Sequence, residues 1–470
     1  MVSIDSAVEL RAANVAQVCD GDLVVGDMAA RRAFGVSTDS RSIRPGEMFV
    51  ALRGEHRDGH DFADAASEAG APVLLVARDG LDKIGVPTRA RSAVVAVADT
   101  LDALQTLARW HRRRFAIPVL AVTGSCGKTT VKEMIAAVAA QKFRVAKSRG
   151  NFNNEIGLPL SLFEIGPVTE FCVVEMGINA PGELTRLCTV AEPTVGLITN
   201  IGRTHLEGLG SVENVAAAKG ELADYLAGRG TLFIGADDPW CKAIAERFPG
   251  ECVTFGEDRE STVRAVRIEP GELTQVTLAD EADPYVVNLP GVHSGRNALA
   301  AVAVGRWLGV SHADIQSGLD TFERMPGRMV VTRLGGATVI DDSYNANPES
   351  VCAALDVLAQ RPATGSRIAV LGDMNELGQA AAELHRLVGA HAARVGVDIV
   401  VAVGTHAEDV VQGARDAGMA AEQCVGLENR DAAVGFLVRY IDGPNVILVK
   451  GSHTSRMEEI VDELSQVSEE

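Results

Sequence analysis

The stretch "PVLAVTGSCGKTTVKEMIAAVAA", Pro118–Ala140, decides the fold class. It passes from an apolar strand-like run, through a turn that contains two glycines, into a segment with helical periodicity. Gly124 and Gly127 let backbone N–H groups turn toward an anion, and the helix that follows adds the positive end of its dipole. Lys128 is placed to reach the β and γ phosphates of a nucleotide, and Thr129 is placed to bind Mg²⁺. We therefore predict a phosphate-binding loop.

The loop is a shortened form of the usual phosphate-loop pattern, because Val122 stands where the longer pattern has its first glycine. An ordinary strand-to-helix turn that happens to contain Gly and Lys is the alternative. The order of strand, glycines, Lys-Thr pair and helix favours the nucleotide site, although a loop alone does not name a reaction. The predicted nucleotide contacts in the loop are Gly124, Ser125, Cys126, Gly127, Lys128, Thr129 and Thr130.

Working outward from the loop, apolar strand-like runs alternate with helical segments. "FCVVEMG" is followed by "PGELTRLCTV", and "TVGLITNI" by "SVENVAAAKGELADYL". Buried strands separated by helices predict an α/β fold with a parallel sheet covered on both faces. Residues 256–290 are richer in β-type residues.

Two boundaries divide the chain. A helical stretch, "DTLDALQTLARWHRRRF", leads into the strand at Pro118, so the first boundary falls near residue 98. After "FERMPGRM" a second alternation of strands and helices begins, and it predicts a separate doubly wound domain. We predict three domains, at residues 1–97, 98–325 and 326–470.

Composition limits the possible partners. The formal net charge is −19, from 44 Lys and Arg against 63 Asp and Glu, which argues against a nucleic acid or an anionic membrane as the main partner.

The eight cysteines lie far apart without a CxxC pair and predict reduced thiols. The amino terminus has no signal-peptide pattern, and no apolar run approaches the ~18 residues of a membrane span. We expect a soluble cytoplasmic protein and a monomer.

Three further polar residues lie in the predicted central domain. Glu175 ends an apolar strand at the edge where parallel sheets bind ligands, and a solvated strand-end carboxylate is an equally good reading. His205 follows another apolar strand, and by default it is a surface or capping histidine. Lys219, within "AAAKGEL", is by default a lysine on a helix surface. None of the three predicts a site by itself.

Taken together, these motifs resemble the Mur ligases, the ATP-dependent amide ligases of cell-wall precursor synthesis. The resemblance covers nearly the whole chain. The motifs that carry it are "STDSRSIRPGEMFVALRGEHRDGHDFADAASEAGA", "GSCGKTT", "GNFNNEIGLPLSL", "VEMGINAPGEL", "NIGRTHLEGLGS", "AKGEL", "PGRM", "DDSYNANPES", "LGDMNELG" and "VKGS". Among the members, "DDSYNANP" and "GNFNNEIG" resemble the dipeptide-adding one, and the DNPR-type motif of the preceding ligase is absent from the sequence.

The resemblance implies an activity and an architecture. It implies a domain for a UDP-sugar at residues 1–97, an ATP-binding ligase domain at 98–325, and a Rossmann-like domain at 326–470 that closes over the site. It implies ligation of D-alanyl-D-alanine to UDP-N-acetylmuramoyl-tripeptide through an acyl phosphate, with ATP and Mg²⁺. It also implies that Lys219 is carbamylated and serves a second Mg²⁺ with Glu175 and His205, since a carbamate is a long carboxylate that suits a hard cation.

The resemblance further assigns ligand contacts residue by residue. Around the nucleotide it places Asn297, Arg328, Asp341, Asp342, Tyr344, Asn345 and Asn347. For the uridine nucleotide it places Thr38, Asp39, Ser40 and Arg41, and for the sugar-peptide it places Asn151, Asn153 and Asn154.

One departure from the family pattern lies after "KGS", where the family commonly has Arg and this chain has His453, with Arg456 three residues later. The resemblance therefore assigns no role to that position. Three other functions stay open at this point: a different amino-acid-adding ligase of the family, a nucleotide-binding regulatory module without turnover, and a kinase that phosphorylates a hydroxyl.

Overall fold

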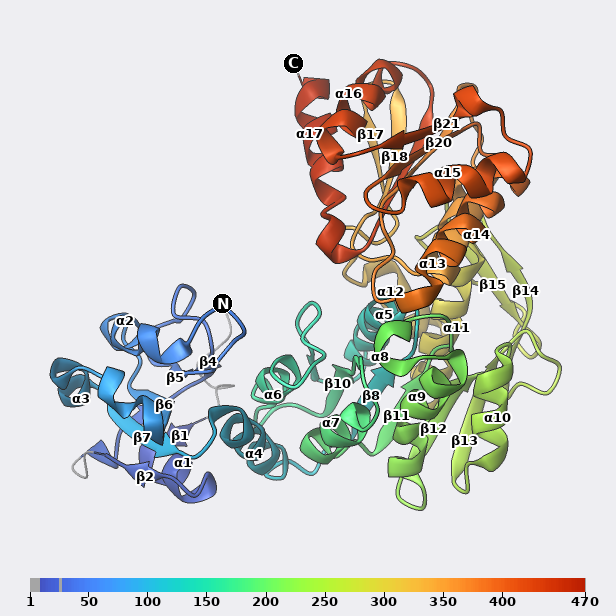
Figure 1. The fold of residues 1–470 in the computed structure, drawn as a ribbon. Coiled ribbons are helices and arrows are strands. Elements are labelled where there is room, and N and C mark those ends of the chain that lie inside the picture. The colour runs from blue at the N-terminus through green and yellow to red at the C-terminus, as the bar shows by residue number, and fades with distance from the viewer. Residues whose placement is uncertain (1–8, 25–27, 470) are drawn as a thin grey trace. The chain divides into compact units, whose positions relative to one another are not determined.

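The computed structural model describes residues 9–24 and 28–469 (Figure 1). They form two compact units, each described here by itself. The first unit takes residues up to 122 together with 143–177 and 184–196, and the second takes 123–142, 178–183 and the chain from 197 onward. Three elements continue from one unit into the other: β8 (Val119–Thr123), α7 (Glu183–Ala191) and β11 (Val195–Ile198).

The first unit begins with a five-stranded sheet of order β2-β7-β6-β5-β4, in which only β2 is antiparallel to its neighbour. The central strands read VLLVA and AVVAV and are buried throughout, because β-branched apolar residues suit a strand covered on both faces. The strands are β2 (Asp22–Leu23), β4 (Val36–Ser37), β5 (Met48–Val50), β6 (Val73–Ala77) and β7 (Ala93–Val97). A small antiparallel pair joins β1 (Leu10–Arg11) and β3 (Arg32–Ala33), and the helices are α1 (Ala12–Val18), α2 (Ala63–Glu68) and α3 (Val86–Arg91).

The remainder of the first unit contains α4 (Thr100–Arg112), whose first turn is capped by the Asp99 carboxylate. Strand β10 (Phe171–Glu175) runs parallel to β8 on one side and to β9 (Val145–Lys147) on the other. Helix α6 (Gly157–Leu162) lies in the chain between β9 and β10. The helix predicted from "DTLDALQTLARWHRRRF" is confirmed.

The second unit contains α5 (Lys128–Ala140), which follows the predicted phosphate loop. The parallel pairing that we predicted continues from β12 through β13 to β14, but β15 and β16 then pair antiparallel. These strands are β12 (Thr231–Gly235), β13 (Glu251–Gly256), β14 (Val263–Glu269), β15 (Thr274–Leu278) and β16 (Tyr285–Val287). The helices are α8 (Leu206–Leu209), α9 (Val212–Leu226), α10 (Pro239–Arg247), α11 (Val292–Trp307) and α12 (His312–Thr321).

The second unit also contains a six-stranded sheet of order β17-β18-β22-β19-β20-β21, parallel except for β17. The predicted doubly wound region is confirmed, with two strands, β17 and β21, that the sequence did not predict. The strands are β17 (Val330–Leu334), β18 (Ala337–Asp342), β19 (Arg367–Leu371), β20 (Ile399–Val403), β21 (Cys424–Leu427) and β22 (Val446–Lys450). The helices are α13 (Pro348–Gln360), α14 (Ala381–Arg394), α15 (Ala407–Asp416), α16 (Arg430–Ile441) and α17 (Glu458–Glu469).

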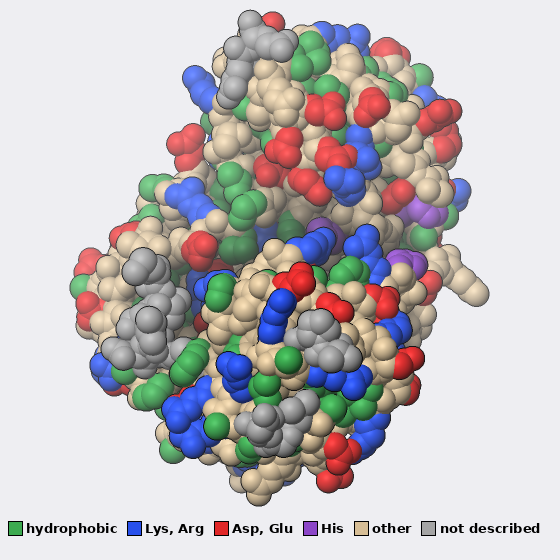
Figure 2. Space-filling view, turned by 90° about the vertical axis from the view of Figure 1, so that its left-hand side faces the viewer, with side chains coloured by type: hydrophobic (Ala, Val, Ile, Leu, Met, Phe, Trp, Pro, Cys, Tyr) green, Lys and Arg blue, Asp and Glu red, His purple; other side chains and the backbone are tan. Residues whose placement is uncertain are grey.

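The α/β class is therefore confirmed. Within residues 9–24 and 28–469, no helix has the length and apolar character needed to cross a bilayer. On the face drawn in Figure 2, acidic and basic side chains both occur, with hydrophobic side chains between them.

Candidate active site

The predicted phosphate loop lies between β8 and α5, and two of its positions require glycine. Gly124 and Gly127 have φ angles of +145° and +82°, which L side chains rarely adopt. A Cβ on Gly124 would overlap the Thr199 hydroxyl, and one on Gly127 would lie 2.5 Å from Asn297 Oδ1. The loop therefore needs its glycines, and Asn297 on α11 lies beside it.

Residues 199–202, which follow β11, are hydrogen-bonded to the phosphate loop. Asn200 accepts hydrogen bonds from the N–H groups of Ser125 and Cys126, at 2.9 Å through its carbonyl and 2.9 Å through its Oδ1. Thr199 Oγ1 donates to the Cys126 carbonyl at 2.6 Å, and Gly202 N donates to Ser125 Oγ at 2.8 Å. The sequence did not indicate these hydrogen bonds, because they join residues far apart in the chain.

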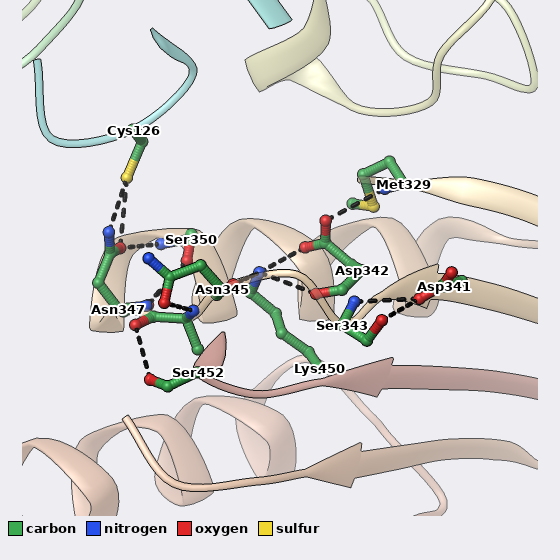
Figure 3. Close-up of polar contacts among 11 residues, drawn as sticks. Cys126, Met329, Asp341, Asp342, Ser343, Asn345, Asn347, Ser350, Lys450 and Ser452 are labelled. Carbon is green, nitrogen blue, oxygen red and sulfur yellow. Dashed lines mark hydrogen bonds and ion pairs between the residues drawn. The ribbon is translucent and has the colours of Figure 1, made fainter. Parts of the chain in front are cut away.

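Lys128 lies at the start of α5, and its Nζ donates to the Gly124 carbonyl at 2.9 Å. The Cys126 thiol is within 3.2 Å of both side-chain polar atoms of Asn347, which caps the N-terminus of α13 (Figure 3). Burial raises the pKa of the Cys126 thiol, so this side chain stays protonated. The loop thus contacts the predicted nucleotide segment that contains Asn347.

Lys219 on α9 is fully buried, so the default reading as a surface lysine is wrong. Its Nζ has no hydrogen-bond partner within residues 9–24 and 28–469. Burial lowers the pKa of Lys219 well below its usual value, and the nearby positive charge of Lys128 lowers it further. Both effects favour the neutral form of the amine, and a neutral amine is a nucleophile.

His205 precedes α8 with a left-handed backbone, at φ +54°. Its Nδ1 lies 2.5 Å from Oε2 of Glu376, a residue of the loop after β19. This close contact with His205, whose Nδ1–H is not aligned as a hydrogen bond, lowers the pKa of Glu376, and the charge of Lys128 lowers it more weakly. The charge of Lys128 therefore acts on both Lys219 and Glu376.

Glu175 ends β10 in the first unit. Only 1% of its surface is exposed, so the reading as a solvated carboxylate is wrong. Asn153 Nδ2 donates to its Oε1 at 2.8 Å, and Ser148 Oγ accepts from its backbone N–H at 3.2 Å. A buried carboxylate with an oriented oxygen is a suitable ligand for a hard cation.

The other predicted substrate residues of the first unit lie in two places. Asn154 Oδ1 accepts from the N–H of Gly157 at 2.8 Å at the start of α6, and Asn151 is exposed. In the segment Thr38, Asp39, Ser40 and Arg41, the Arg41 guanidinium donates to both oxygens of Asp39. These hydrogen bonds lower the pKa of Asp39 to about 2.

A buried lysine contacts the predicted nucleotide segment at the end of β18 and after it (Figure 3). Lys450, at the end of β22, lies 2.5 Å from Asp342 Oδ2 and donates to the Asn345 carbonyl at 2.9 Å. The other Asp342 oxygen accepts from the N–H of Met329, which has a left-handed φ of +54°. Asp342 therefore fixes the backbone next to Arg328.

Arg328 and Tyr344 stack, with the guanidinium carbon 4.1 Å from the ring centroid. His453 lies 5.4 Å from the same ring, so the histidine that departs from the family pattern joins this stack. Asp341 Oδ1 accepts from the N–H of Ser343 at 3.1 Å. A recess in the same unit places Thr130 beside Arg328, two of the predicted nucleotide contacts. It is lined by Thr130, Leu289, Phe322, Glu323, Arg324, Met325 and Arg328.

Three family models match the chain in order. They describe the Mur ligase family catalytic domain over residues 33–112, the Mur ligase middle domain over 122–305, and the Mur ligase glutamate ligase domain over 327–453. The UDP-N-acetylmuramoyl-tripeptide–D-alanyl-D-alanine ligase of Escherichia coli (strain K12) is 37% identical over 442 residues, which is 92% of this chain and 93% of that protein.

Solved structures agree with the sequence match. MurF from Acinetobacter baumannii superposes with a TM-score of 0.86 at 30% identity, covering 98% of this chain and all of that one. MurF from Thermotoga maritima, in complex with ADP, superposes with a TM-score of 0.77 at 27% identity, covering 95% of this chain and 99% of that one. The α/β architecture of three domains is shared with these structures. The chain belongs to the Mur ligase family.

Proposed function

We infer that the chain joins D-alanyl-D-alanine to UDP-N-acetylmuramoyl-tripeptide at the expense of ATP, in the synthesis of a peptidoglycan precursor. The observation that carries this inference is similarity to ligases of that name over nine-tenths of both chains, together with an intact phosphate loop. Because the reaction consumes ATP, we propose that it takes place in the cytoplasm.

The chemistry follows from the weakness of a carboxylate as an electrophile. The terminal carboxylate of the tripeptide attacks the γ-phosphorus of ATP, the bond to the β-phosphate oxygen breaks, and ADP leaves. The amine of D-alanyl-D-alanine then attacks the acyl carbon, phosphate leaves, and the nitrogen loses a proton. Lys128 neutralises negative charge on the phosphates during the first step.

Mg²⁺ supplies further neutralisation of phosphate charge. Thr129, at the start of α5, is the residue that we propose for the first ion. For a second ion we propose His205, Glu175 and carbamylated Lys219. The state of Lys219 supports the modification, because a neutral, buried amine without a hydrogen-bond partner in the described chain can add CO₂ and release a proton. The resulting carbamate has two oxygens where the free amine has none.

The remaining assignments follow the family resemblance. The loop Gly124–Thr130, Asn297, Arg328, Tyr344 and the segment from Asp341 to Asn347 hold the nucleotide in this proposal. The observations that support it are the proximity of Asn297 to Gly127, the contact of Asn347 with Cys126, and the recess that both Thr130 and Arg328 line. Residues 38–41 and Asn151, Asn153 and Asn154 hold the UDP-sugar-peptide.

Mass spectrometry of the reaction product tests the proposed function. The purified chain is incubated with ATP, Mg²⁺, D-alanyl-D-alanine and UDP-muramoyl tripeptide, offered separately with diaminopimelate and with lysine as third residue. We expect a product that contains both peptides, together with ADP and phosphate, and none with Lys128→Ala. A product that carries another amino acid indicates a different ligase of the family, a stable phosphoester indicates a kinase, and nucleotide binding without product indicates an inactive module.

A further inference from the structure

The loop that follows β19, residues 372–378, reaches the segment around His205. Two separate groups of Glu376 make the contact. Its carboxylate lies 2.5 Å from His205 Nδ1, and its backbone carbonyl accepts from the N–H of Glu207 at 2.9 Å. Glu376 therefore contacts His205 through its side chain and Glu207 through its backbone carbonyl.

Both partners have an unusual backbone. His205 has φ +54° and Glu376 has φ +61°, in the left-handed region that non-glycine residues adopt only uncommonly. Only six non-glycine residues within the described parts of the chain have a positive φ, and two of them form this pair. Such conformations persist where the surrounding structure holds them, and they concentrate at functional sites.

The loop is held firmly on its own side. Met374 N donates to Nε2 of the buried His385 at 2.9 Å, and Asn375 N donates to Ser452 Oγ at 2.8 Å. On the other side, the N–H of Leu209 donates to the His205 carbonyl at 2.9 Å. Hydrogen bonds thus hold the backbone on both sides of the contact, in segments that lie far apart in the sequence.

Stability alone does not explain this arrangement. The Glu376 side chain is 51% exposed and that of His205 is 20% exposed. Ion pairs with that much solvent contact contribute little to folding, so the pair does not offset the strain of two left-handed residues. The feature that the geometry does determine is the orientation of the imidazole ring.

We propose that Glu376 is a positioning residue for His205. Its carboxylate keeps the imidazole proton on Nδ1, so that Nε2 is left with a free lone pair and is the ring atom that serves the reaction. Histidines that bind metal ions commonly donate their other ring N–H to a carboxylate, which fixes tautomer and ring direction. The proposal rests on the role of His205 given under the proposed function. It adds a residue of the loop after β19 to a site otherwise built around the phosphate loop.

The first test is spectroscopic and needs no activity. The full chain is labelled with ¹⁵N-histidine, and the His205 signals are identified by their loss in His205→Asn. Spectra are recorded near pH 8.5, well above the usual histidine pKa of about 6.5. We expect the His205 proton on Nδ1 in the parent chain, and a shift toward Nε2-protonated imidazole in Glu376→Ala and Glu376→Gln. Glu383→Ala, which removes an exposed glutamate from α14 nearby in the sequence, leaves the spectrum unchanged.

The second test is a double-mutant cycle on the ligase reaction. Glu376→Ala lowers kcat by about 10-fold, as loss of such a supporting carboxylate commonly does. Because Glu376 acts through His205, the same change adds no further loss to His205→Ala.

The outcomes separate the two proposals. An unchanged tautomer in both Glu376 variants, or losses in kcat that multiply in the double variant, overturns the positioning role. Full activity of His205→Ala overturns the role proposed for His205 in the reaction, and the tautomer measurement then still decides whether Glu376 orients the ring.

Discussion

Two buried lysines of the second unit have opposite surroundings. Lys450 is 3% exposed, and its ammonium meets the Asp342 carboxylate and the Asn345 carbonyl at 2.5 and 2.9 Å. Lys219 is fully buried, and within the described residues its Nζ has no hydrogen-bond partner at all. The two side chains are equally hidden from water but differ in what they meet inside the protein.

The difference indicates two uses of a buried amine. A buried cation with its charge and hydrogen bonds satisfied holds a local structure, here the segment after β18. For a buried amine without hydrogen-bond partners, desolvation lowers the pKa and so favours the neutral, nucleophilic form. Lys450 thus holds the segment after β18, whereas burial favours the neutral form of Lys219 that the proposed carbamylation requires.

Breaking the Lys450 pair tests the structural half of the comparison. Lys450→Met leaves the Asp342 carboxylate without its cation, and we expect the free energy of unfolding to fall by about 3–5 kcal/mol. Urea denaturation measures the change. The exposed Lys242→Met serves as the matched control and stays within about 0.5 kcal/mol of the parent. A loss below about 1 kcal/mol for Lys450→Met contradicts the role given to this pair.

Replacing Lys219 tests the proposal that this lysine takes part in the reaction. We expect Lys219→Ala to lower kcat by about 10²–10³-fold, the range for loss of one group that stabilises developing charge. Short carboxylic acids added to this variant restore part of the activity, because a carboxylate then occupies the place of the carbamate. Steady-state kinetics with and without the acids measures both effects. Full activity of the variant without any added acid removes the carbamate from the mechanism.

His111 on α4 lies outside the proposed site, and it shows how burial alone changes the pKa of a basic side chain. Its Nε2 lies 2.8 Å from the Ile165 carbonyl, and burial lowers the pKa of His111 to about 4. Between pH 6.5 and 4 the unfolded chain takes up a proton that the folded chain does not. Stability from this group is therefore complete above pH 6.5, and up to about 3 kcal/mol is lost as the pH falls toward 4.

Denaturation across that pH range checks the calibration. His111→Phe removes this part of the slope, and the exposed His56→Phe leaves it in place. An equal slope in His111→Phe and the parent chain shows that burial at this position does not oppose protonation.

The smallest effect concerns the stability cost of Lys219 itself. In buffer free of CO₂ and Mg²⁺, Lys219→Met replaces an unpaired buried amine with an apolar side chain of similar length. We expect a gain of about 1 kcal/mol in the free energy of unfolding, opposite in sign to Lys450→Met. Thermal and urea denaturation measure it. A clear loss of stability implies that Lys219 has stabilising partners after all and would end the contrast between the two lysines.

Much of the fold could be predicted from the sequence, because strand and helix periodicity are local. The runs that became β8, β10 and β11 were all predicted as strands. The β17 and β21 strands were missed, since both are only partly buried edge strands with a weak apolar pattern. The direction of β15 and β16 was not predicted either, because strand pairing depends on the path of the whole chain.

The sequence by itself determined the phosphate loop and the family, since glycines, Lys128 and motif order are read along the chain. Only the tertiary structure decided that Glu175 and Lys219 are buried, and that Glu376 meets His205. Local patterns do not contain this information, because burial and side-chain pairing arise when distant segments pack together. The state of an ionisable group therefore depends on neighbours that the sequence places far away.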